Sequence, residues 1–155
     1  MSAKANAPAP AGIVNFSRVE ATVACGGAAE PSAMAALAAE GFKTVINLRL
    51  ASEPGVAEEE AVVTMAGLTY LHLPMDPMAP TAATADHFLE LLADQSLRPV
   101  FIHCASANRV GAVWAIKRVV QDGWNRERAL EEGKAVGMKS PVMLEFVTRY
   151  LDARR

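Results

Sequence analysis

The residues of this chain best suited to chemistry are Cys104 and Arg109, within the segment His103-Cys104-Ala105-Ser106-Ala107-Asn108-Arg109. A cysteine thiolate is a nucleophile, and the planar guanidinium of an arginine fits two oxygens of one phosphate. Only small or polar residues separate the two. The segment therefore predicts a cysteine-based site that takes up an anion such as a phosphoryl group.

The elements around this segment would position it well. Residues 99–103 are a short apolar run typical of a buried strand, and an apolar helix is predicted from about Val110 to Asp122. Ligands of open α/β sheets lie beyond the carboxyl ends of the strands. Backbone N–H groups of residues 105–109 would converge there, and the helix dipole adds partial positive charge. We expect residues 105–109 to bind phosphate, with the same positive surroundings favouring the Cys104 thiolate.

A plainer interpretation of the two residues exists. Cysteine is among the most buried residue types, so Cys104 could be a core thiol and Arg109 a surface residue. Cysteine followed five positions later by arginine is common by chance. The position of the pair between a strand and the start of a helix is what favours the functional interpretation.

Strands and helices are predicted to alternate along the chain. Two short strands are expected within 13–24, then helices and strands in turn: helix 32–40, strand 44–48, helix 57–66, strand 68–73, helix 84–94, strand 99–103, helix 110–122 and two closing helices capped by Asn125 and Ser140. Ser32 is expected to cap the first helix, and Gly41 is well placed to end it. This order predicts an α/β fold with a mostly parallel central sheet flanked by helices.

Length and composition limit the broad class. The 155 residues fit one domain, here residues 13–155, preceded by an Ala- and Pro-rich flexible arm at 1–12. The net charge of -2 and scattered basic residues give no sign of nucleic-acid binding. No run approaches the roughly 20 apolar residues of a membrane span, so no membrane partner is expected and the cytoplasm is the expected location.

The segment resembles the phosphate-binding loop of the protein tyrosine and dual-specificity phosphatase superfamily, which normally has one residue more between Cys and Arg. With Gly41-Phe42-Lys43-Thr44-Val45-Ile46-Asn47-Leu48-Arg49 upstream and Arg109-Val110-Gly111-Ala112-Val113-Trp114-Ala115 downstream, it resembles the bacterial beta-lactamase hydrolase-like family of phosphatase-like proteins. The likeness runs from Phe16 to Asp152. It implies a cysteine-phosphatase-like fold with Cys104 as nucleophile and Arg109 as phosphate clamp.

Two positions depart from the family pattern. Relatives commonly have Gly where Ala107 stands, and a glycine there tolerates positive φ and lets the backbone approach an oxyanion closely. The superfamily often places Ser or Thr directly after the Arg, to stabilise the leaving thiolate, where this chain has Val110. Both departures bear on turnover more than on anion binding.

A phosphatase also needs an acid to protonate the leaving oxygen. Asp76, in the Pro-flanked loop after the strand at 68–73, is the candidate, and in the resembled superfamily the acid lies on a loop before the Cys strand. An Asx-type turn explains Asp76 equally well. His103 is expected to hold the loop by hydrogen bonding, either as a tuning group or as a structural histidine.

Several other residues are assigned plainer roles. Glu58 to Glu60 are expected to be the solvated first turn of a helix. Arg49, which follows the strand at 44–48, is expected at the surface, and a position near the same sheet edge as the loop is the alternative. Cys25 is interpreted as a packing residue. The alternative is that Cys25 is the resolving cysteine that forms a disulfide with Cys104. Three histidines and no dense carboxylate cluster make a metal site improbable, and no cofactor is implied.

The residues of the 103–109 segment are compatible with three functions. The first is a phosphoric monoester hydrolase acting through a phosphocysteine, the second a rhodanese-like sulfurtransferase, and the third a phosphate-binding module without turnover. The expected partner is a phosphorylated substrate, either a small molecule or a phosphoprotein. The sequence carries no information on oligomeric state.

Overall fold

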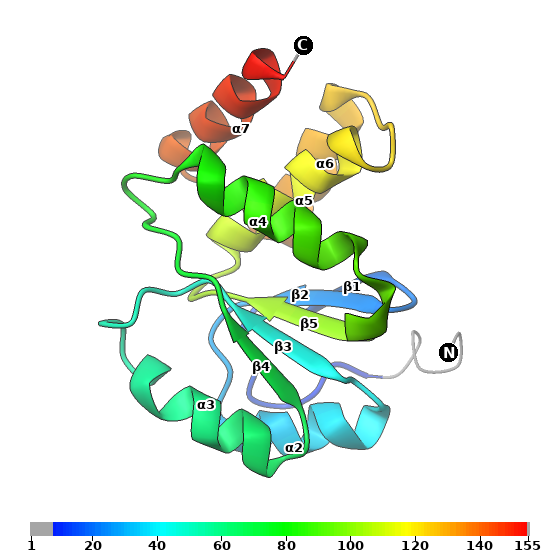
Figure 1. Cartoon of the computed structure of the whole chain (residues 1–155), viewed down its shortest axis with the longest axis vertical. Helices are drawn as coiled ribbons and strands as arrows, with labels where there is room; N and C mark the ends of the chain where they lie inside the picture. The colour runs from blue at the N-terminus through cyan, green and yellow to red at the C-terminus, as the bar shows by residue number, and fades with distance from the viewer. Residues whose placement is uncertain (1–7, 155) are drawn as a thin grey trace.

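A five-stranded sheet lies between two layers of helices in the computed structural model, which describes residues 8–154 (Figure 1). Helices α2 and α3 cover one face of the sheet, and α4 to α7 lie over the other (Figure 1). The elements follow in the order β1 (Ser17–Glu20), β2 (Val23–Gly26), α2 (Pro31–Glu40), β3 (Thr44–Asn47), α3 (Val56–Met65), β4 (Thr69–His72), α4 (Ala82–Ala93), a 3₁₀ turn (Gln95–Leu97), β5 (Val100–His103), α5 (Asn108–Val120), α6 (Arg126–Val136) and α7 (Pro141–Ala153).

The strand order in the sheet is β1-β2-β5-β3-β4. Strand β5 pairs in parallel with β2 on one side and β3 on the other, and β4 pairs in parallel with β3. Only β1 runs antiparallel, as a hairpin with β2. The prediction of an α/β fold with a mostly parallel sheet is therefore confirmed, and the strand that carries the Cys104 loop is its central strand.

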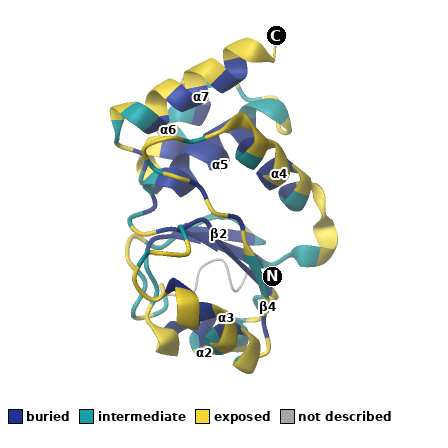
Figure 2. Ribbon diagram, turned by 60° about the vertical axis from the view of Figure 1, so that its left-hand side comes forward, coloured by how far each residue is buried: buried dark blue, intermediate teal, exposed yellow. Residues whose placement is uncertain are grey.

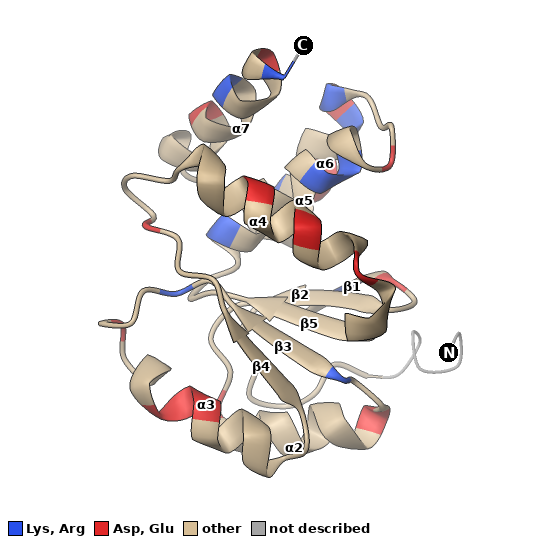
Figure 3. Cartoon of the chain, viewed as in Figure 1, with Lys and Arg blue, Asp and Glu red and all other residues tan. Residues whose placement is uncertain are grey.

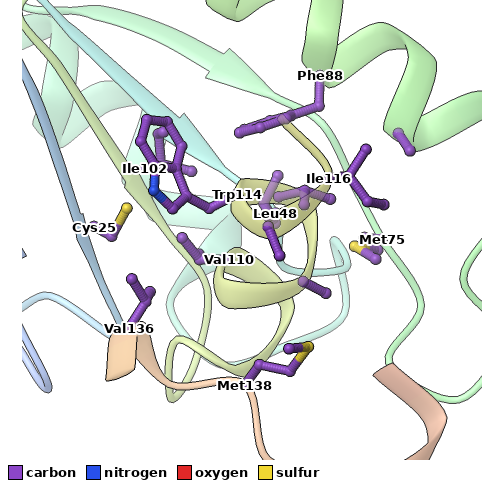
Figure 4. Packing of buried hydrophobic residues seen from close by; sticks show 14 of the residues in the cluster. Cys25, Leu48, Met75, Phe88, Ile102, Val110, Trp114, Ile116, Val136 and Met138 are labelled. Atoms are coloured by element: carbon purple, nitrogen blue, oxygen red, sulfur yellow. The ribbon is translucent and has the colours of Figure 1, made fainter. Parts of the chain in front are cut away.

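Two apolar clusters hold the layers together, one on each face of the sheet. Successive side chains of a strand point to opposite faces, and accordingly Ile102 and Cys104 belong to the cluster under α5 while Phe101 belongs to the cluster over α2 and α3. Trp114 and Val110 of α5 pack in the first cluster (Figure 4). Figure 2 shows α5 as the most buried helix, whereas α2, α3 and α7 each expose an outer face.

Most helix ends follow the predicted signals, with one correction. Gly41 ends α2 in the left-handed conformation, at φ 101°. The side chain of Asn125 caps α6 by accepting from the Arg128 amide at 2.8 Å, and the Ser140 hydroxyl caps α7. The predicted Ser32 cap of α2 is wrong, because Pro31 already occupies the first turn, where its missing N–H costs nothing.

The expected arm at 1–12 falls partly outside the described residues, which begin at residue 8. Within the described part, the Pro8 carbonyl accepts from the Arg18 side chain at 3.1 Å, and the Gly12 carbonyl accepts from the Glu30 amide at 2.8 Å. Across residues 8–154, no helix has both the length and the apolar character needed to cross a membrane.

Candidate active site

The Cys104 loop begins where the central strand ends. The Cys104 amide donates a hydrogen bond to the carbonyl of Gly26, the last residue of β2, at 3.3 Å. Helix α5 begins four residues later, at Asn108. The loop thus joins the carboxyl end of a parallel strand to the start of a helix, which is the position where open α/β sheets place their ligands.

The peptide groups of the loop are turned so that their N–H groups face inward. The Ala105 carbonyl accepts from the Ala28 amide at 2.8 Å, and the Ser106 carbonyl accepts from the Asn15 side chain at 3.0 Å. The C=O and N–H of one trans peptide point in opposite directions, so the next two amides face away from these outer partners. Within the described chain, the amides of residues 105–110 donate to no protein acceptor. These free donors suit an anion.

Ala107 joins the loop to the helix in a left-handed conformation, with φ 75° and ψ 7°. This conformation is unfavourable for a residue with a Cβ. Gly137, after α6, lies directly against it: a Cβ built on Gly137 would come within 2.7 Å of the Ala107 Cβ. The close packing of these two residues fixes the loop despite the strain at Ala107.

Arg109 is buried, and one carboxylate holds the end of its guanidinium. Nη1 and Nη2 donate to the two oxygens of Glu53 at 2.7 and 2.9 Å, and Nη1 also donates to the Met75 carbonyl at 3.1 Å. A guanidinium has five N–H donors. The two that remain, Nε–H and one N–H of Nη2, share one edge, and this edge has the spacing of two phosphate oxygens.

Charge coupling links Arg109 to both Glu53 and Cys104. Burial acts to lower the pKa of Arg109, but the Glu53 hydrogen bond and the nearby Cys104 and Glu53 groups raise it above its ordinary value. The Arg109 hydrogen bond in turn holds the pKa of Glu53 below its ordinary 4.5, with the Leu50 amide adding to this effect. The guanidinium is therefore a fixed positive charge beside the cysteine.

Glu53, which holds Arg109, was not among the residues predicted from the sequence. It lies in the loop between β3 and α3, more than fifty positions before Arg109 in the chain. Its position four residues after Arg49, beyond the carboxyl end of β3, was the available signal, because the carboxyl ends of parallel strands meet at one edge of the sheet.

Cys104 itself has no exposed surface, whereas Ala105 is exposed and Ser106 is half-buried. Its side chain belongs to the apolar cluster under α5. In this conformation the thiol is therefore closed off from solvent, behind the loop and beside the Arg109 guanidinium.

A second buried network lies behind the loop, and it corrects the expectations for Arg49 and Glu59. Both side chains are buried rather than solvated. Arg49 Nη2 donates to Glu59 Oε1 at 2.7 Å, and Glu59 Oε2 lies 2.6 Å from Nε2 of His103. Nδ1 of His103 lies 3.1 Å from the Gly27 carbonyl. Three consecutive glutamates at the start of a helix suggest a solvated first turn, and this holds for Glu58 and Glu60. Glu59 between them is buried, which the sequence pattern did not indicate.

The remaining predicted residues lie at the rim of the loop. Asp76 is exposed, and its Oδ1 accepts from the Met78 amide at 2.9 Å in an Asx turn. It directly follows Met75, whose carbonyl accepts from Arg109. The Asn108 side chain turns away from the loop: Oδ1 accepts from the Lys139 amide at 2.8 Å, which ties the loop to the α6–α7 connection.

Cys25 lies in β2, inside the same apolar cluster as Cys104 and beside Trp114 and Ile102 (Figure 4). It is free and fully buried. Burial raises the pKa of its thiol far above the ordinary value, with the charge of Glu132 adding to the effect. A protonated, enclosed thiol is suited to packing.

Sequence comparison matches residues 8–146 to the family described as DSP-PTPase phosphatase fused to NAD+ kinase. The chain belongs to this family. It is also similar to beta-lactamase hydrolase-like proteins: 28% identical over 120 residues to that of Agrobacterium fabrum, and 30% identical over 104 residues to that of Xylella fastidiosa. These matches cover 75% and 64% of this chain. The chain spans about a quarter of the length of these relatives (27% and 24%).

Solved phosphatase structures share the fold. TpbA of P. aeruginosa superposes with a TM-score of 0.71 at 25% identity, covering 90% of this chain and 84% of TpbA. The core catalytic domain of the PP-IP phosphatase SIW14 of S. cerevisiae, in complex with citrate, has a TM-score of 0.76 at 16% identity, covering 90% and 87%. The family and these folds confirm the resemblance to phosphatase-like proteins inferred from the 103–109 segment.

Proposed function

We propose that this phosphatase-family chain is a phosphoric monoester hydrolase acting through a phosphocysteine on Cys104. One observation carries the proposal. The loop that begins at Cys104, at the end of the central strand, combines amides of residues 105–110 that have no protein acceptor with the edge of the Arg109 guanidinium that Glu53 leaves toward Cys104. In Figure 3 the ribbon segments coloured for Asp and Glu include parts of α3 and α4, which lie on opposite sides of the sheet. Anion binding therefore depends on this loop and not on the field of the whole molecule.

The reaction follows in two displacements. In the first, the Cys104 thiolate attacks phosphorus and forms an S–P bond while the P–O bond to the leaving group breaks. Asp76, as the acid, gives its proton to the departing oxygen. In the second, water attacks phosphorus, the S–P bond breaks to return the thiolate, and the Asp76 carboxylate takes the proton of the water. Arg109 and the loop amides hold the equatorial oxygens in both steps.

The closed state of Cys104 is part of this proposal. A phosphoryl group contacts the sulfur only after the loop or the Arg109 side chain yields space. An incoming dianion offers Arg109 a partner on its free edge while Glu53 keeps the other edge, so the guanidinium can clamp the substrate without losing its support.

The substrate class proposed is a phosphorylated small molecule or a phosphoprotein. A cysteine-to-serine variant of TpbA has been solved in complex with pTyr, and SIW14 is a PP-IP phosphatase. Few aromatic residues (6%) are present in this chain to form a stacking wall for a phosphotyrosine ring.

A second candidate is a phosphate-binding module without turnover. The left-handed Ala107 and the enclosed Cys104 favour it, because both hinder the approach of an oxyanion to the loop. Val110, buried in the core, also offers the leaving thiolate no hydroxyl. Phosphate binding without hydrolysis at any pH would support this candidate over the enzyme.

The test is hydrolysis of p-nitrophenyl phosphate by the wild type and by Cys104→Ser, with Cys25→Ser as the matched control. The proposal predicts that Cys104→Ser abolishes hydrolysis while Cys25→Ser retains it, since Cys25 lies in the core and takes no part in the two steps. Hydrolysis that survives Cys104→Ser unchanged would exclude the cysteine mechanism.

A further inference from the structure

His103 lies between two hydrogen-bond acceptors, although it is completely buried. Nε2 is 2.6 Å from the Glu59 carboxylate and Nδ1 is 3.1 Å from the Gly27 carbonyl. A backbone carbonyl can only accept, so Nδ1 must carry a proton. A neutral imidazole has one N–H and therefore can satisfy only one such partner.

Whether Nε2 of His103 also carries a proton depends on whether Glu59 is ionised. Its other oxygen accepts from Arg49 at 2.7 Å, and Arg49 is always charged. A carboxylate beside a guanidinium favours its ionised form. Arg49 is in turn fixed by the Asn47 side chain and the Pro54 carbonyl, so it cannot turn away. With Glu59 ionised, Nε2 must also donate, and the ring is an imidazolium.

The resulting buried group carries two positive charges, on Arg49 and His103, and one negative charge, on Glu59. Its net positive charge lies one residue before Cys104, on the opposite face of β5. The neighbouring strand β4 adds Tyr70 and His72. Burial raises the pKa of Tyr70, and the charge of Glu59 adds to this effect. His72 lies with Nε2 2.6 Å from the Arg49 carbonyl and stacks on the Tyr70 ring.

The same ring also ties down the loop. The Gly27 carbonyl that faces Nδ1 belongs to the turn whose next amide, of Ala28, holds the Ala105 carbonyl. Gly27 approaches so closely that a Cβ there would come within 2.5 Å of the Ala105 oxygen. The chain of contacts therefore runs from Glu59 through His103 and Gly27 to the first residue of the loop.

We propose that Glu59 is a positioning residue that holds His103 as a buried imidazolium and so favours the Cys104 thiolate. This role rests on the proposed function, in which that thiolate is the nucleophile. Glu59 touches neither the cysteine nor the substrate site, so its effect passes through the charge and position of His103.

Nitrogen NMR of protein labelled with ¹⁵N-histidine tests the proposal without using activity. The His103 signals, assigned with His103→Asn, are expected to show two protonated ring nitrogens near neutral pH in the wild type. Glu59→Gln keeps an acceptor oxygen but removes the charge, and should return His103 to a neutral tautomer. The control Glu60→Gln, exposed on the same helix, should leave the signals unchanged. A neutral His103 in the wild type would overturn the proposal, whether or not the chain hydrolyses phosphate.

Two further measurements test the role of the Glu59 charge: the alkylation rate of Cys104, and the restoration of the His103 signals by an added carboxylate. Alkylation of Cys104 below neutral pH should slow severalfold in Glu59→Gln, because the positive charge moves away from His103, which is next to Cys104 in the chain, and remains only on Arg49. Glu59 also lines a cavity of about 670 Å³ beside α2 and α3, so formate can enter and replace the carboxylate in Glu59→Ala. Formate, but not formamide, should restore the two-proton signature. Equal restoration by formamide, or alkylation of Glu59→Gln at the wild-type rate, would contradict the role of the charge.

Discussion

Glu53 holds Arg109 by both oxygens of its carboxylate, at 2.7 and 2.9 Å, and so fixes which edge of the guanidinium stays free. The residues lie on different elements, one in the loop before α3 and the other in the first turn of α5. Since Arg109 is buried, this pairing sets its direction before any anion arrives.

Replacing Glu53 by Gln should therefore weaken phosphate binding. We expect roughly a tenfold rise in the dissociation constant for inorganic phosphate and a loss of about 1–2 kcal/mol in the free energy of unfolding, because a buried guanidinium loses a charged partner. Calorimetric titration and urea unfolding measure the two. Glu58→Gln, exposed on α3, is the control. Unchanged phosphate affinity in Glu53→Gln would show that Glu53 does not orient Arg109.

The same pair predicts a pH dependence of stability. The pKa of Glu53 is lowered below 4.5 in the folded chain, mainly by the Arg109 hydrogen bond. The stabilisation is therefore complete above the unfolded value and is lost as the pH falls through the folded value. Wild-type stability should fall more steeply than that of Glu53→Gln below about pH 4.5. Parallel curves for the two proteins in that range would contradict the assignment.

Ala107→Gly should raise turnover. Glycine adopts φ 75° without strain and lets the backbone approach an oxyanion more closely. Removing the Cβ relieves about 1 kcal/mol of backbone strain in the folded chain. This gain is offset because the methyl contact with Gly137 is lost and because glycine makes the unfolded chain more flexible. The free energy of unfolding should therefore change by less than about 1 kcal/mol. We expect kcat on an aryl phosphate to rise roughly threefold, a small part of what a full oxyanion donor contributes. Ala57→Gly, at an exposed position of α3 outside the loop, should leave kcat unchanged. A fall in kcat for Ala107→Gly would refute the strain argument.

The sequence predicted the elements of the fold well and the buried polar contacts poorly. Apolar runs such as 99–103 and cap residues such as Asn125 are local signals, and the corresponding elements formed at nearly the predicted residues. Glu59 and Arg49 could not be recognised as buried, because what encloses them is the packing of α3 against the loop after β3. Glu53 was missed for the same reason: its partner Arg109 is distant in the chain and close only in the fold.

Asp76→Asn distinguishes the two roles of Asp76, as the proposed general acid and as the residue that forms the Asx turn. The Asn oxygen can still accept from the Met78 amide, so the turn should persist while the acidic proton is lost. We expect kcat/KM on an alkyl phosphate to fall roughly 10²- to 10⁴-fold, because its leaving oxygen needs protonation, and to fall far less on p-nitrophenyl phosphate. Equal effects on both substrates would assign Asp76 to the turn alone.

Asn108→Ala should loosen the loop from the α6–α7 connection. Its side chain accepts from the amides of Lys139 and Ser140 and donates to the Ser140 hydroxyl. Loss of these three bonds should cost about 2–3 kcal/mol of unfolding free energy. Asn108→Asp keeps both amide contacts and should cost about 1 kcal/mol. Thermal unfolding of the two variants checks the order, and a smaller loss in the alanine variant than in the aspartate variant would contradict it.

Capture of the covalent intermediate tests the central claim most directly. Asp76→Asn should form the S–P bond with p-nitrophenyl phosphate, whose leaving group needs little acid, but should hydrolyse that bond slowly for want of a base. Acid quenching during turnover, followed by mass spectrometry of the digest, is predicted to place one phosphoryl group on the peptide that contains Cys104. Hydrolysis without any phosphoryl group on Cys104, or with the group on another residue, would contradict the account.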